Sequence, residues 1–66
     1  MKHLNEIQLQ HLIDRYDLAL DLENGSAVAS RKDGRELKPE TVAKMVGMKE
    51  TPANWKADGH GRVTGL

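Results

Sequence analysis

The chain has 66 residues, carries no net charge and contains no cysteine. A chain of this length is expected to form one domain, and the lack of cysteine excludes disulfides and thiolate metal sites within it. Hydrophobic residues make up 38% of the chain, with one Trp, one Tyr and no Phe, so the core must be small and aliphatic. No apolar run approaches the ~20 residues of a membrane span, and no signal peptide is recognisable. We therefore expect a protein of the cytoplasm, or of a virion if phage-encoded, without membrane contact.

The first predicted element is a long helix over residues 6–23. Asn5 is a favourable N-cap, and Gln8 follows it at the spacing of a capping box. The pair Asn24-Gly25 is typical of a helix C-terminus, where glycine takes a left-handed conformation. These start and stop signals bracket a single helical segment.

This predicted helix is apolar on two faces. One broad stripe at helical spacing contains Leu9, Leu12, Ile13, Tyr16, Ala19 and Leu20. Ile7, Leu18 and Leu22 would project from nearly the opposite side. Either the second face binds a partner, or the hairpin and the second helix cover one face each; the pattern allows both.

A β-hairpin and a short second helix are expected next. Residues 26–32 and 35–38 flank Asp33-Gly34, a dipeptide that favours a two-residue hairpin turn. Pro39 is suited to the first position of a helix, and Gly47 to its end. Residues 58–66 are rich in Gly without a repeating period, which predicts a flexible or semi-ordered segment after a domain over residues 1–57.

The sequence shows no motif for catalysis or for cofactor binding. His3, His11 and His60 lack the spacing of a helical metal pair, and no phosphate-binding loop, dinucleotide fingerprint or nucleophile elbow occurs. We therefore expect that the protein is not an enzyme and has no small-molecule substrate. We also expect no catalytic residues and no site for a cofactor or a metal.

One alternative function is DNA binding by a helix-turn-helix. Residues 40–48 combine a small inward residue, Ala43, with Gly47 in a following turn, as two closely crossed helices require. Residues 51–57 would then be the recognition helix, and the second half of the chain is the more basic one, with eight Lys or Arg against five Asp or Glu. The residues expected to contact DNA are Lys44, Lys49, Asn54 and Lys56.

Several short stretches resemble a known family. Asp21-Leu22, Gly25, residues 28–30 (Val-Ala-Ser) and residues 33–35 (Asp-Gly-Arg) resemble the middle of the small W-type head-completion proteins of tailed phages, over about residues 12–46. This resemblance implies a helix, a β-hairpin and a helix in that order. It also implies a protein that docks as a ring under the portal and joins head to tail.

We thus expect an α+β fold: a long N-terminal helix, a β-hairpin, a short second helix and a semi-ordered C-terminal segment. We expect a non-enzymatic phage or bacterial protein that docks on a macromolecular assembly. It should either bind a protein partner or form a homo-oligomer. A small inhibitor of a host protein complex is a further alternative. The residues expected to meet a partner are Ile7, Leu18, Leu22, Trp55, His60 and Arg62.

Overall fold

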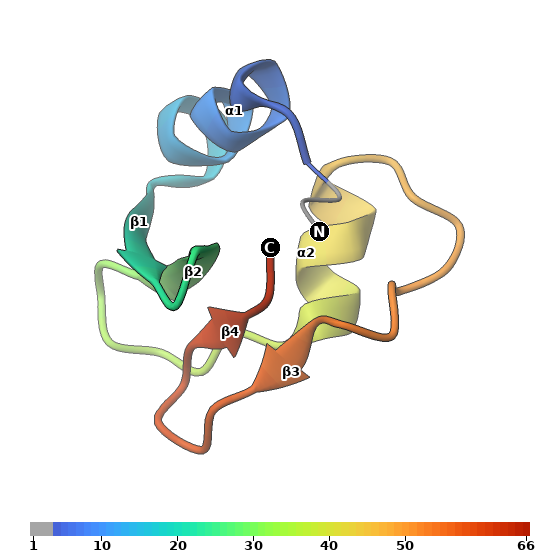
Figure 1. The fold of residues 1–66 in the computed structure, drawn as a ribbon. Coiled ribbons are helices and arrows are strands. Elements are labelled where there is room, and N and C mark those ends of the chain that lie inside the picture. Colours follow the sequence, from blue (N-terminus) through green and yellow to red (C-terminus); the bar gives the residue numbers. More distant parts are fainter. Residues whose placement is uncertain (1–3) are drawn as a thin grey trace.

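The computed structural model describes residues 4–66, which form a small α+β fold, as expected (Figure 1). His3 lies outside the described residues. The elements follow one another as α1 (Glu6–Tyr16), β1 (Leu18–Glu23), β2 (Ser26–Arg31), α2 (Pro39–Met45), β3 (Lys56–Ala57) and β4 (Val63–Thr64).

Helix α1 begins as predicted but ends earlier. The Asn5 side chain accepts a hydrogen bond from the Gln8 backbone N–H at 2.8 Å, and the Gln8 side chain accepts one from the Asn5 N–H at 3.0 Å, completing the capping box. The helix stops at Tyr16, because Asp17 takes a left-handed conformation with φ 55° and turns the chain back. The prediction of helix for residues 17–23 was therefore wrong.

The hairpin is formed by different residues from those predicted. β1 and β2 pair antiparallel, with Glu23 opposite Ser26 and Leu18 opposite Arg31. Asn24 and Gly25 form the turn, both at positive φ, as a two-residue type I′ turn requires. The predicted first strand over residues 26–32 does exist as β2, but the predicted pairing with residues 35–38 was wrong.

Helix α2 begins at Pro39, as expected, and buries Val42 and Ala43. Gly47 follows its end at φ 78°. Residues 51–57 do not form the expected second helix; they make a turn held by a 3.1 Å hydrogen bond from the Trp55 N–H to the Pro52 carbonyl, and then enter β3. A helix-turn-helix is therefore absent from residues 39–57.

The four strands form one antiparallel sheet in the order β1-β2-β4-β3. Residues 58–66, expected to be flexible, contribute β4 and two core side chains, Val63 at 0% and Leu66 at 1% exposure. The Leu66 N–H also donates to the Ala27 carbonyl at 3.0 Å. Figure 1 shows this end of the chain in the middle of the molecule, between the sheet and both helices.

The core lies between the two helices and one face of the sheet. As expected it is mainly aliphatic, and its buried members come from every part of the described chain: Leu4, Leu12, Leu18, Ala27, Ala29, Leu37, Val42, Ala43, Trp55, Val63 and Leu66. Within residues 4–66, no helix is long and apolar enough to cross a membrane.

Candidate docking surface

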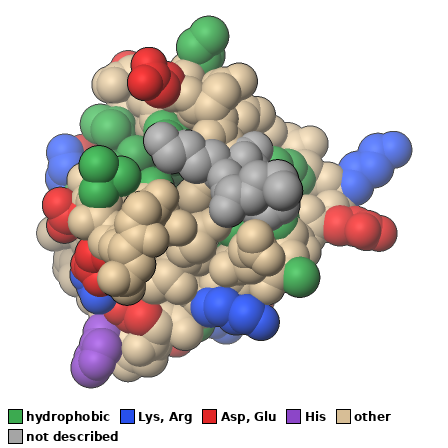
Figure 2. Space-filling view, in the orientation of Figure 1, with side chains coloured by type: hydrophobic (Ala, Val, Ile, Leu, Met, Phe, Trp, Pro, Cys, Tyr) green, Lys and Arg blue, Asp and Glu red, His purple; other side chains and the backbone are tan. Residues whose placement is uncertain are grey.

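Among residues 4–66, two large aliphatic side chains stay exposed. Ile7 on α1 is 80% exposed, and Leu22 on β1 is 77% exposed. In Figure 2, hydrophobic side chains reach the surface over the region of α1 and β1, with charged side chains around them. Both residues were expected to meet a partner, but they lie at two different hollows rather than on one helix face.

The first hollow lies between the two helices and has a volume of about 190 Å³. We name it the α1–α2 groove; its lining residues are Ile7, Gln8, His11, Met45 and Val46. Its apolar members are Ile7 from α1 and Met45 and Val46 at the end of α2, and Ile7 stays 80% exposed beside them.

The second hollow lies between α1 and the hairpin and has a volume of about 340 Å³. We name it the α1–β1 surface; its lining residues are Leu9, Leu20, Asp21, Leu22 and Ala27. Alternation along β1 places Leu18, Leu20 and Leu22 on the same face of the sheet. Their exposure rises from 0% at Leu18 to 77% at Leu22, so the apolar row begins in the core and ends in solvent.

The α1–β1 surface adjoins an edge of the sheet. β1 is the terminal strand, and within residues 4–66 its backbone makes no hydrogen bond to any strand except β2. In a two-residue hairpin the flanking pair, here Glu23 and Ser26, is hydrogen-bonded, and alternate pairs follow it. The N–H and C=O groups of Leu20 and Leu22 therefore point away from β2.

Two of the other residues expected to meet a partner belong to the core. Leu18 is 0% exposed and Trp55 is 3% exposed, so neither offers a surface. Sequence analysis missed Leu9, Leu20, Asp21 and Ala27, which do line the α1–β1 surface. The strict alternation of Leu18, Leu20 and Leu22 was the signal that could have found it.

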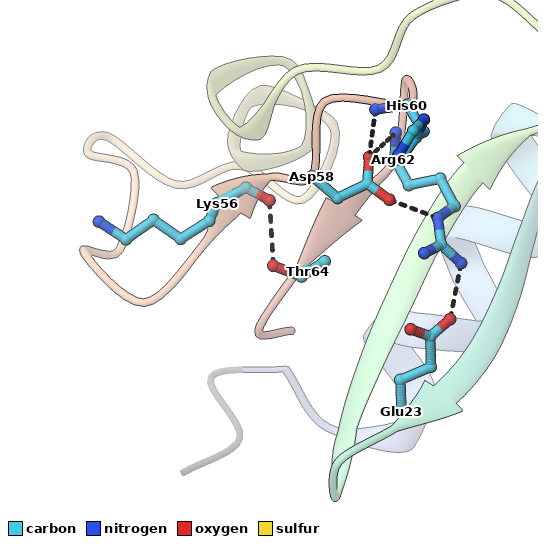
Figure 3. Close-up of polar contacts among 6 residues, drawn as sticks. All are labelled: Glu23, Lys56, Asp58, His60, Arg62 and Thr64. Carbon is cyan, nitrogen blue, oxygen red and sulfur yellow. Dashed lines mark hydrogen bonds and ion pairs between the residues drawn. The ribbon is translucent and has the colours of Figure 1, made fainter.

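His60 and Arg62 lie in the turn between β3 and β4 (Figure 3) and do not line the α1–β1 surface. Asp58 holds this turn: one carboxylate oxygen accepts from the backbone N–H groups of His60 at 2.7 Å and Arg62 at 3.1 Å. The other oxygen pairs with the Arg62 guanidinium at 2.5 Å, and the same guanidinium bonds Glu23 at 2.6 Å. Arg62 thereby ties the β3–β4 turn to the end of β1.

These contacts change the acidity of Asp58. The pKa of its carboxyl falls from 3.8 to about 2, first because of the hydrogen bond from the His60 N–H and then because of Arg62. Since the pKa of the folded state lies below that of the unfolded chain, this carboxylate stabilises the fold fully above pH 3.8, and the stabilisation is lost as the pH falls towards 2.

We expect the Asp58→Asn variant to be less stable than the wild type at neutral pH, because it loses the ion pair with Arg62. The difference in free energy of unfolding should shrink as the pH is lowered from 3.8 to about 2. Urea unfolding followed by Trp55 fluorescence at a series of pH values measures it. A difference that did not vary with pH would show that the charge of Asp58 is not what stabilises the turn.

The residues expected to contact DNA are spread along the segment from α2 to β3. Lys44 lies in the last turn of α2, Lys49 and Asn54 in the connection, and Lys56 in β3, all exposed. No helix presents them, so they do not form the predicted recognition helix. Among residues 4–66, no group of three or more His, Cys, Asp or Glu side chains is placed to hold a metal ion.

Comparison with known proteins finds no match to a family model, to a curated protein sequence or to a solved structure.

Proposed function

We propose that this chain is a non-enzymatic interaction protein of phage or bacterial type, which docks on a macromolecular assembly through the α1–β1 surface. The observation that carries the proposal is the exposure of Leu22 beside an apolar hollow of about 340 Å³. Exposing a large aliphatic side chain next to further apolar atoms gives a monomer no stability, and such patches mark interaction sites.

The assembly that we propose is the joint between a phage head and tail. The support for this choice is the resemblance of about residues 12–46 to head-completion proteins, together with the element order. That resemblance implies a helix, a hairpin and a helix, and α1, the β1–β2 hairpin and α2 follow one another in this order, with the hairpin turn at Asn24-Gly25 rather than at Asp33-Gly34.

The test places a photoreactive benzoylphenylalanine at position 22 in cells that produce the protein, or at Lys49 as the control. Both positions are exposed, but only position 22 lies on the α1–β1 surface. We expect a covalent adduct with one partner from position 22 and none from position 49. Mass spectrometry of the adduct identifies the partner.

A portal or tail protein in the adduct would support head–tail joining, and a host enzyme would favour the inhibitor alternative. If position 22 gave no adduct beyond that of position 49, the docking proposal would be wrong. As a complementary variant, Leu22→Asp should abolish the interaction and keep the fold, because Leu22 is 77% exposed. Leu18→Asp should instead unfold the chain, since it would bury a carboxylate in the core.

A further inference from the structure

The outer edge of β1 offers the hydrogen-bonding groups that an added strand needs. Leu20 and Leu22 each present an N–H and a C=O on the side away from β2, and no described residue bonds them. An unpaired strand edge is a template for pairing with another extended segment. A segment paired with this edge could form four backbone hydrogen bonds, two with Leu20 and two with Leu22.

The α1–β1 surface determines which side chains such a segment would carry. Residues paired with Leu20 and Leu22 would place their side chains on the same face as these leucines. That face opens into the hollow lined by Leu9 and Ala27. Apolar side chains at these two positions, which are separated by one residue, would therefore bury the exposed part of Leu22.

The charge of Asp21 determines which residue the added segment should carry between its two apolar positions. Asp21 lies in the middle of β1, is exposed, and makes no ion pair within residues 4–66. The neighbouring carboxylates differ, because Asp17 pairs with Lys32 at 3.2 Å and Glu23 with Arg62 at 2.6 Å. On the outer edge, Asp21 occupies a non-hydrogen-bonded position, where opposing side chains approach most closely. A Lys or Arg opposite it would supply the missing charge.

The same charges argue against a second copy of β1 as the added strand. In a symmetric antiparallel pair, residues whose backbone points outward must face each other, so the two-fold axis passes through a residue position. The registers that pair at least three residues of β1 place this axis at position 19, 20, 21 or 22. An axis at 19 places Asp21 opposite Asp17, and an axis at 20 places Glu23 opposite Asp17. An axis at 21 places Asp21 opposite its own copy, and one at 22 places it opposite Glu23. Like charges directly opposite each other destabilise the registers with the axis at 21 or 22. In the other two, Asp17, which lies just before β1, brings a like charge to the end of the pairing.

We propose that the partner supplies an extended segment that adds a strand to the free edge of β1, with Lys or Arg opposite Asp21 and an apolar residue on each side of that cation in sequence. This inference rests on the proposed function and specifies how the docking surface recognises its partner. A basic extended polypeptide is thus the ligand, recognised through backbone hydrogen bonds, the α1–β1 surface and one ion pair.

The probe is a seven-residue peptide of alternating Val and Lys, with a peptide of alternating Val and Glu as its control. NMR measures how fast the amide hydrogens of Leu20 and Leu22, which the peptide should cover, exchange with water. The amides of Ala19 and Asp21, which already donate to β2, are measured alongside them. With the Val-Lys peptide at ten times its Kd, about a tenth of the protein is free, so exchange at Leu20 and Leu22 should slow about tenfold. The Val-Glu peptide should leave the exchange rates of Leu20 and Leu22 unchanged.

A charge reversal tests the ion pair. In Asp21→Lys, the affinity for the Val-Lys peptide should fall about tenfold, because an attractive cross-strand pair becomes repulsive, and the Val-Glu peptide should bind instead. Glu50→Lys makes the same change of charge at an exposed position outside β1 and should retain the wild-type preference.

Three results would overturn strand addition: no binding of the Val-Lys peptide, binding without slower exchange at Leu20 and Leu22, or equal effects of the two charge reversals. None of them bears on the cross-linking result at position 22. A partner adduct there together with unprotected amides would mean that the α1–β1 surface docks its partner through side chains alone, so the two proposals fail separately.

Discussion

The Gly65→Ala variant should be mostly unfolded under conditions in which the wild type is folded. Gly65 has φ +86°, and a Cβ at this position would overlap the backbone carbonyl oxygen of Asn54. The methyl group therefore meets rigid backbone beside the buried Trp55, and β4 must move away from this segment. We expect a loss of about 3 kcal/mol or more, from left-handed strain and overpacking together. A chain of this size holds roughly 3–10 kcal/mol of stability in total.

Gly59→Ala is the matched control for this prediction. Gly59 has nearly the same φ, +83°, but a Cβ there would have no atom within 4 Å. Its cost should be the conformational strain alone, about 1 kcal/mol. Urea unfolding followed by circular dichroism and Trp55 fluorescence measures both variants. Equal losses would show that residues 54 and 65 are not in close contact in solution.

The Leu66→Ala variant should lose about 2–5 kcal/mol, the usual range for removing a buried leucine side chain. Leu66 is 1% exposed and packs in the core that both helices share with the sheet. Alanine retains the backbone hydrogen bond to Ala27, so the effect isolates the side chain. The free energy of unfolding from urea titration measures it.

Leu22→Ala removes the same atoms at a position that is 77% exposed. It should change the free energy of unfolding by no more than about 0.5 kcal/mol, as is usual for surface substitutions. If Leu66→Ala were as stable as Leu22→Ala, residues 63–66 would not be part of the core in solution. This pair of variants therefore tests whether the C-terminal segment belongs to the folded domain.

The parts of the fold that could be predicted from the sequence depend on local chemistry. The capping box of Asn5 and Gln8 needs only neighbouring residues, and the start of α2 follows from the fixed φ of Pro39. The end of α2 before Gly47 is equally local. In each case one residue type favours one backbone geometry, so tertiary packing did not override the signal.

The error in β1 arose because one dipeptide serves two structures. Asn24-Gly25 suits a helix C-terminus and a type I′ turn equally well, since both require positive φ. Residues 18–23 also satisfy both a helical and an alternating pattern. The deciding interaction is non-local: β2 is covered on its other side by β4, with Ala29 opposite Val63. A sheet that includes β1 becomes favourable only with that distant strand in place.

The candidate site was predictable only in part, because its position depends on β1, which was expected to be helical. Exposed Ile7 and Leu22 were identified as apolar residues in excess of what one core needs, and the structure leaves both uncovered. Leu18 was assigned to the same face because a helix was assumed, although in a strand it points into the core. Asp21 and the free edge of β1 could not be recognised before the strand itself was.

The central position of residues 63–66 also bears on how this chain matures in the cell. The ribosome produces α1 and the β1–β2 hairpin first, but the edge of β2 that faces away from β1 remains unpaired until β4 arrives. Until Val63 and Leu66 have left the exit tunnel, the nascent chain exposes both edges of the hairpin and much of its apolar interior. Folding of residues 4–66 is therefore completed only once this segment has emerged, and until then the exposed apolar surface and unpaired strand edges favour aggregation.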